Sequence, residues 1–242
     1  MSTKHQVHNL IILDESGSMQ GIKRTIIEGF NEIVQTIKGI EKEYPEQEHF
    51  ISLVSFNGLA LKPIHFLEPV SSLGIIDESR YNPDASTPLF DAMGYSLNRL
   101  KAELVNAIDY NVLVTILTDG EENASREYDG IAIKKLIEEL KLNRWTFTYI
   151  GTEHDVEKVA ASFSITNTMT FSKSHAAMKR MFEKDKFARS GYSEKIRRKE
   201  DTTHEFYDKE NENETNKATL TGNPKNYKNW WPKISDPNIT SS

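Results

Sequence analysis

The apolar and polar positions of residues 1–182 switch repeatedly between two periods. Short, mostly apolar runs are typical of strands buried on both faces, and they occupy residues 7–13, 50–56, 112–117, 145–150 and 168–171. Between the runs, apolar residues recur every three or four positions, which predicts amphipathic helices over residues 22–37, 89–108, 133–140, 155–163 and from 176 onward. This alternation predicts an α/β protein with a mostly parallel sheet and helices on both faces.

One connection departs from the alternation. Asn57-Gly58 is a turn signal between the strand that ends at Phe56 and a further predicted strand, Leu61–Phe66. Because so few residues join these two strands, we expect an antiparallel hairpin. In a later strand, Trp145, Phe147 and Tyr149 alternate with polar residues, which predicts one packed aromatic face.

The chain changes character near residue 182. Residues 183–242 contain 12 Lys and Arg, 11 Asp and Glu and only 13 hydrophobic residues, which is too little apolar surface to offset the entropy of ordering. We therefore expect one domain over residues 1–182 and a charged, largely disordered extension over 183–242, in which 183–199 can continue the last helix. Near its end, Trp230 and Trp231 are expected either to dock on the domain or to recognise a partner.

Composition narrows the function further. The chain has no Cys and a formal net charge of −6, so thiolate metal sites and disulfides are excluded and the basic footprint of a nucleic-acid-binding protein is missing. No apolar run reaches the roughly 18 residues of a membrane span, and the stretch after Asn9 is shorter than a signal-peptide core. We therefore expect a cytoplasmic protein with no nucleic-acid or membrane partner; the sequence leaves its oligomeric state open.

Oxygen-bearing side chains gather where predicted strands end. Asp14, Ser16 and Ser18 alternate directly after the first strand, Thr87 precedes a helix, and Asp119 follows a later strand. Ligands of parallel α/β sheets bind beyond the carboxyl ends of the strands. Carboxylates and hydroxyls suit Mg²⁺, which takes oxygen ligands and keeps several waters. The pattern predicts a Mg²⁺ site, which could also take Mn²⁺ or Ca²⁺.

Three motifs together resemble the metal-ion-dependent adhesion site (MIDAS) of the von Willebrand factor A (vWA) domain family: Asp14-x-Ser16-x-Ser18, Thr87 in Thr-Pro-Leu, and Asp119 in Thr-Asp-Gly. The resemblance covers residues 5–182. It implies a Rossmann-like, doubly wound sheet with one antiparallel edge strand, which here would be Leu61–Phe66. It also implies that the three hydroxyls contact the metal and that the two carboxylates bind it directly or through water.

The same resemblance suggests the type of protein and the surface that meets its partner. Small proteins that consist mostly of one such domain resemble the stand-alone intracellular members found in bacteria and phages. Around the metal we expect a rim that meets the partner, formed by Glu15, Met19, Ser86, Gly120 and Glu121.

Each motif also has a simpler interpretation. Asp14 and Ser16 could cap the first long helix, since both residue types are preferred N-caps. Thr87 could cap the helix that follows Pro88, and Asp119-Gly120 could be an ordinary turn.

The leading functional hypothesis is a non-enzymatic, metal-dependent protein-binding module whose partner offers an Asp or Glu to the bound ion. A first alternative is a metal-assisted phosphoesterase, because phosphatases of the haloacid-dehalogenase type also have an Asp after the first strand of a parallel sheet. Those enzymes use an Asp-x-Asp pair, however, and the third position here is Ser16. A second alternative is a scaffold whose C-terminal tail tethers another partner, because linked sites gain from effective concentration.

Overall fold

Six strands form one sheet in the part of the chain that the structure describes. This computed structural model describes residues 4–152 and 156–207. The strand order is β3-β2-β1-β4-β5-β6, and every neighbouring pair is parallel except β2 and β3. The strands are β1 (His5–Asp14), β2 (Gln47–Phe56), β3 (Leu61–Pro69), β4 (Tyr110–Leu117), β5 (Trp145–Thr152) and β6 (Asn167–Phe171). The predicted parallel sheet and its antiparallel edge strand are confirmed.

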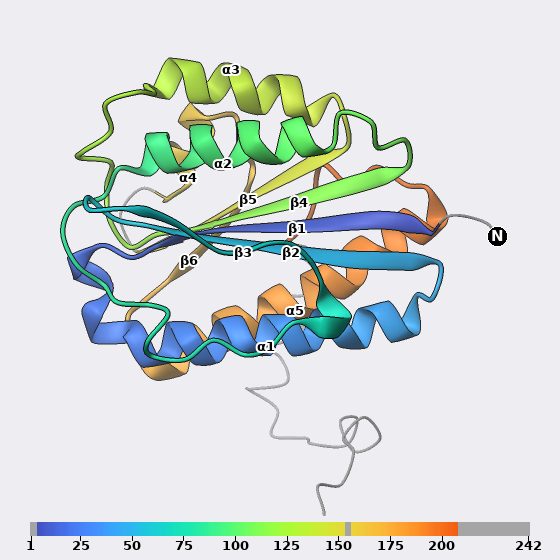
Figure 1. The fold of residues 1–242 in the computed structure, drawn as a ribbon, viewed down its shortest axis with the longest axis horizontal. Helices are drawn as coiled ribbons and strands as arrows, with labels where there is room; N and C mark the ends of the chain where they lie inside the picture. Colours follow the sequence, from blue (N-terminus) through green and yellow to red (C-terminus); the bar gives the residue numbers. More distant parts are fainter. Residues whose placement is uncertain (1–3, 153–155, 208–242) are drawn as a thin grey trace, which may run out of the picture. The chain divides into compact units, whose positions relative to one another are not determined.

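Helices cover both faces of the sheet, as Figure 1 shows. One face carries α2 (Leu89–Glu103), α3 (Gly130–Lys141) and α4 (Val156–Ser162), and the other carries α1 (Lys23–Glu43) and α5 (His175–Arg198). Short 3-10 helices lie over Gly17–Ile22 (η1) and Val70–Ser72 (η2). α2 ends five residues before the predicted limit at Ile108, whose side chain is exposed. Among the described residues, no helix is both long and apolar enough to cross a membrane.

Successive side chains of the central strands point to opposite faces. In β1, Leu10 and Ile12 join the core under α2 and α3, whereas Ile11 and Leu13 join the core under α1. The aromatic face predicted for β5 is confirmed, because its three aromatic rings are buried in the first of these cores. The two cores therefore hold β1 and β4 rigidly, with their carboxyl ends at one edge of the sheet.

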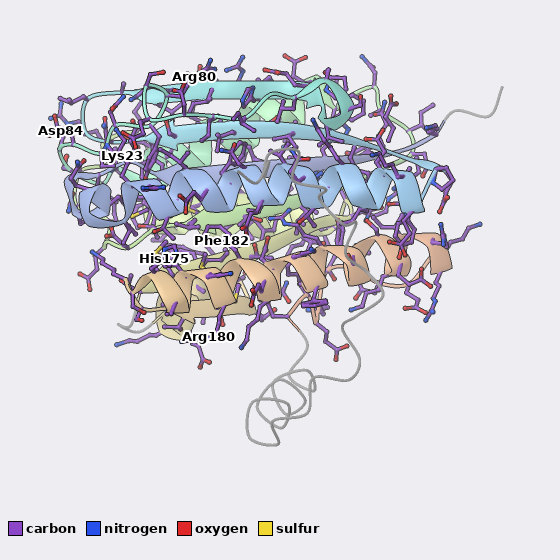
Figure 2. The ribbon with its side chains drawn as sticks, turned by 90° about the horizontal axis from the view of Figure 1, so that it is seen from below. Lys23, Arg80, Asp84, His175, Arg180 and Phe182 are labelled. Carbon is purple, nitrogen blue, oxygen red and sulfur yellow. The ribbon has the colours of Figure 1, made fainter. Side chains whose placement is uncertain are left out.

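α1 and α5 approach each other closely at Gly29. A Cβ atom at this position would lie 2.0 Å from the ring of Phe182. Figure 2 shows Phe182 pointing into the space between the two helices. The contact therefore requires a residue without a side chain on α1.

The packed part of the chain continues past residue 182, where the sequence placed the domain boundary. α5 extends to Arg198, and the compact unit reaches Tyr207. Phe206 is buried against Tyr192. Sequence reasoning underestimated this segment because hydrogen bonds hold much of it, such as the one that Asn111 Nδ2 donates to Thr202 Oγ1 over 2.9 Å. The tail positions Trp230 and Trp231 lie outside the described residues.

α5 contains a buried ion pair whose arginine is hydrogen-bonded to the middle of the sheet. Arg189 Nε lies 2.5 Å from Asp185 Oδ2, and both side chains are almost fully buried. Arg189 also donates to Thr115 Oγ1 over 2.9 Å and to Asn9 Oδ1 over 3.3 Å. Tyr207 donates its hydroxyl proton to Asp185 Oδ1 over 3.2 Å. Each of the two charges therefore has an oppositely charged partner and further hydrogen bonds, which is the condition under which buried ions are tolerated.

Candidate metal site

Asp14 is the last residue of β1, and its buried carboxylate lies where the parallel strands have their carboxyl ends. Its Oδ1 accepts a hydrogen bond from the Ser16 amide over 2.7 Å, and its Oδ2 accepts one from Thr118 Oγ1 over 2.6 Å. Burial raises the pKa of the Asp14 carboxyl, these hydrogen bonds oppose that shift, and the nearby charge of Asp119 raises the pKa further. A cation beside Asp14 would favour its ionised form.

The two serines link the first motif to the end of β4. Ser16 Oγ lies 3.1 Å from Ser18 Oγ, which in turn donates to Asp119 Oδ1 over 2.6 Å. The first motif does not cap the first long helix, because the N-cap residue of α1 is Ile22. Ser16 stands at the N-cap of η1, but its side chain makes no capping hydrogen bond there. The helix-cap interpretation of Asp14 and Ser16 is therefore wrong.

Thr87 faces the same point from the start of α2. An ideal Cβ on Gly120 would lie 3.4 Å from Thr87 Oγ1, 3.8 Å from Ser18 Oγ and 3.9 Å from Asp14 Oδ2. Oxygens of the first motif and of Thr87 thus converge beside Gly120, and a side chain at this position would lie among them. Sequence reasoning predicted this meeting of strand ends and a helix start.

Two hydrogen bonds with Asn123, in the loop after β4, hold the backbone of Thr87. Its amide donates to Asn123 Oδ1 over 2.9 Å, and its carbonyl accepts from the Asn123 amide over 3.2 Å. Glu122 takes the capping role at α2, because its Oε2 accepts the Phe90 amide over 2.9 Å. The N-cap position of α2 is Pro88, so the Thr87 hydroxyl is not the cap of this helix.

Asp119 presents a buried oxygen toward the same cluster. Its Oδ2 receives no well-aligned hydrogen bond from the described residues, although the Lys173 ammonium lies 2.5 Å away. The β4 loop is held in place by Thr152 Oγ1, which donates to the Asp119 carbonyl over 2.9 Å.

The donor set fits a hard divalent cation. Two carboxylates and three hydroxyls would supply only oxygen ligands, as Mg²⁺ prefers. Within residues 4–152 and 156–207, no three His, Cys, Asp or Glu side chains are grouped so that they could hold a metal ion. A metal bound at this edge of the sheet would therefore depend on the hydroxyls of Ser16, Ser18 and Thr87.

The predicted rim is only partly at the surface. Ser86 and Glu121 are exposed and Gly120 is half-buried, but Glu15 and Met19 are buried. The Glu15 carboxylate is enclosed by Lys62 Nζ at 2.8 Å and by Ser55 Oγ at 2.7 Å. Lys62 lies 47 residues and Ser55 40 residues from Glu15 in sequence, so no local pattern could indicate that Glu15 points inward.

A shallow pocket of about 470 Å³ opens among the loops next to the cluster. Its lining includes Lys23, Leu59, Lys62 and Asp84, and Figure 2 shows Lys23 and Asp84 at the same end of the molecule. The loop that carries Asp84 is tied to the first motif, because the Gly17 amide donates to the Ala85 carbonyl over 3.0 Å. The surface beside the oxygen cluster therefore offers apolar and charged contacts together.

Comparison with solved structures shows a similarity of fold, while no protein-family model and no curated protein matches the chain. The pilus adhesin SpaC from Lactobacillus rhamnosus GG, in its open conformation, is 12% identical, with a TM-score of 0.54 over 77% of this chain and 30% of the adhesin. Proximal thread matrix protein 1 from the mussel byssus is 12% identical, with a TM-score of 0.48 over 75% of this chain and 45% of that one. The SpRpn10 VWA domain is 11% identical, with a TM-score of 0.45 over 73% of this chain and 93% of the domain.

The chain thus spans less than half the length of the adhesin and of the mussel protein. The mostly parallel sheet with one antiparallel edge strand and helices on both faces (Figure 1) is the architecture that the resemblance to vWA domains implies. On this basis the fold is vWA-like.

Proposed function

We propose that this protein is a Mg²⁺-dependent protein-binding module with a complete MIDAS, formed by Asp14, Ser16, Ser18, Thr87 and Asp119. The observation that carries the proposal is that Asp14 Oδ2, Ser18 Oγ and Thr87 Oγ1 lie within 4 Å of one point beside Gly120, while Ser18 Oγ donates to Asp119 Oδ1 over 2.6 Å. Two carboxylates balance the charge of one divalent ion, and the remaining positions suit waters. A partner's Asp or Glu would supply a further oxygen ligand to the ion.

The surface around the cluster supports a protein partner. The pocket beside it and the exposed Leu59 side chain supply contact area outside the metal. Mn²⁺ or Ca²⁺ can take the place of Mg²⁺ in an all-oxygen site. We further propose that the protein works in the cytoplasm, as a stand-alone bacterial or phage member of the family would, and without a nucleic-acid or membrane partner.

We propose a binding role rather than a catalytic one. The phosphoesterase alternative needs a second carboxylate two residues after Asp14, and this position is Ser16, whose hydroxyl lies 3.1 Å from that of Ser18. Magnesium-dependent turnover of an aryl phosphate that is lost in Asp14→Asn would establish the enzyme instead.

Peptide selection on the full chain tests the binding role. Peptides selected from a random library in Mg²⁺ should share one Asp or Glu, and their binding should disappear with chelator or with Asp119→Ala. The matched control is Glu127→Ala, because Glu127 is an exposed acid in the loop that follows Asp119. Peptides that bind equally well with chelator, or that need no acidic residue, would contradict the proposal.

A further inference from the structure

Lys173 places a positive charge directly against the proposed metal site. It lies between β6 and α5, and its ammonium is 2.5 Å from Asp119 Oδ2. The same ammonium donates to the Ser18 carbonyl over 3.3 Å. Lys173 therefore bridges two of the segments that carry the proposed ligands, although no sequence motif includes it.

The charges around Asp119 indicate what this lysine does. The Asp119 side chain is fully buried, whereas that of Lys173 is 44% exposed. A buried carboxylate needs a partner charge, and Lys173 supplies it within the protein itself. Its ammonium neutralises only one of the two carboxylates, so a divalent ion remains the better match for both.

The Lys173 side chain can leave without rearranging its surroundings. Ser174 Oγ caps α5 by accepting the Ala177 amide over 3.3 Å, and the next residue, His175, has its Nδ1 3.4 Å from Thr25 Oγ1 on α1. These contacts hold the backbone on the C-terminal side of Lys173. Because lysine has a flexible four-carbon stem, the ammonium can swing into solvent while the backbone stays in place.

We propose that Lys173 is a built-in competing cation, which pairs with Asp119 in the metal-free protein and gives up this carboxylate when the metal binds. This inference rests on the proposed function, because it assigns Lys173 a part in regulating the same site. Its consequence is that Lys173 weakens the affinity for divalent ions while it stabilises the metal-free fold.

Calorimetric titration of the full chain with Mn²⁺ tests the competition. Lys173→Met keeps the length of the side chain and removes its charge, so it should bind Mn²⁺ on the order of fivefold more tightly, as expected from the worth of a half-exposed ion pair. Lys173→Arg keeps the charge and should not show this gain. The matched control is Lys179→Met, because Lys179 is an exposed lysine on α5 and its loss should leave the affinity unchanged.

Thermal unfolding gives a second, independent readout. With chelator, Lys173→Met should unfold at a lower temperature than the wild type, because Asp119 then lacks its partner. Saturating Mn²⁺ should raise the unfolding temperature of Lys173→Met more than that of the wild type.

The outcomes separate this inference from the proposed function. If the wild type and Lys173→Met bind Mn²⁺ with equal affinity, or if Lys173→Met binds more weakly, the competition is refuted while the metal site stands. If neither protein binds Mn²⁺, the metal site itself is refuted, and the inference falls with it.

Discussion

The two faces of the sheet are built on different physical principles. Under α2, α3 and α4, the strands present apolar residues almost without interruption, including Val114, Phe147 and Tyr149. The opposite face is apolar under α1. Under α5 it also holds a polar cluster, in which Asn9 and Thr115 meet the guanidinium of Arg189, beside a small apolar cluster. Apolar burial alone therefore fixes one face, whereas the other face combines apolar burial with a hydrogen-bonded ion pair.

The largest expected effect comes from the apolar face. Phe147 is fully buried and stacks on Trp145 at a centroid distance of 6.3 Å. Phe147→Ala should lower the free energy of unfolding by about 4 kcal/mol, since a large side chain is replaced by a cavity. Urea unfolding measures this loss, and a loss below about 1 kcal/mol would show that this core is not tightly packed.

The next effect comes from the ion pair on the other face. Arg189→Met leaves Asp185 buried without its partner and should cost about 3 kcal/mol. The double variant Asp185→Leu/Arg189→Met should recover most of this loss, because it removes both charges together. A double variant as unstable as Arg189→Met alone would mean that the pair is not the source of the effect.

Two glycine substitutions on α1 test the contact between α1 and α5, with a smaller expected effect on stability. Gly29→Ala should destabilise the fold by about 2 kcal/mol through overpacking against Phe182. Gly39 lies on the same helix, and a Cβ there would meet nothing within 4 Å. Gly39→Ala should therefore stabilise the fold, by up to about 1 kcal/mol through helix propensity. Equal effects of the two changes would contradict the close approach at Gly29.

The smallest expected effect is a change in the free energy of unfolding with pH, which comes from the buried His49. Burial and the neighbouring charge of Arg189 lower the pKa of His49 to about 3 from 6.5. The unfolded chain therefore takes up this proton first, so stability is full above pH 6.5 and decreases as pH falls toward 3. Between pH 7 and 5.5, His49 should contribute a loss of about 1 kcal/mol. His49→Phe should flatten the measured slope, and an unchanged slope would exclude His49 as its source.

The apolar face was the more predictable of the two from sequence. The alternation of Trp145, Phe147 and Tyr149 assigns a face by itself, because successive strand residues point in opposite directions. On the other face, Asn9 and Arg189 are 180 residues apart. No pattern within one strand or one helix indicates that these two polar groups satisfy each other. The continuation of the last helix past residue 182 was predicted, but its packing on the sheet was therefore missed.

Part of the candidate site was predictable from the sequence and part was not. The meeting of Asp14, Thr87 and Asp119 was predictable, since parallel strands deliver their carboxyl ends to one edge. The burial of Glu15 by Lys62 and the approach of Lys173 to Asp119 were not. Each of these two contacts joins a residue of the motifs to a lysine far away in sequence that belongs to no motif.

We propose that hydroxyls and carboxylates from three segments hold one divalent ion, and calorimetric titration of the full chain with Mg²⁺ is the decisive experiment for this proposal. We expect one Mg²⁺ per chain, an affinity at least about tenfold weaker in Thr87→Ala, which corresponds to about 1.4 kcal/mol, and no change in Glu127→Ala. Absence of Mg²⁺ binding by the wild type, or binding that is the same in Thr87→Ala, would contradict it.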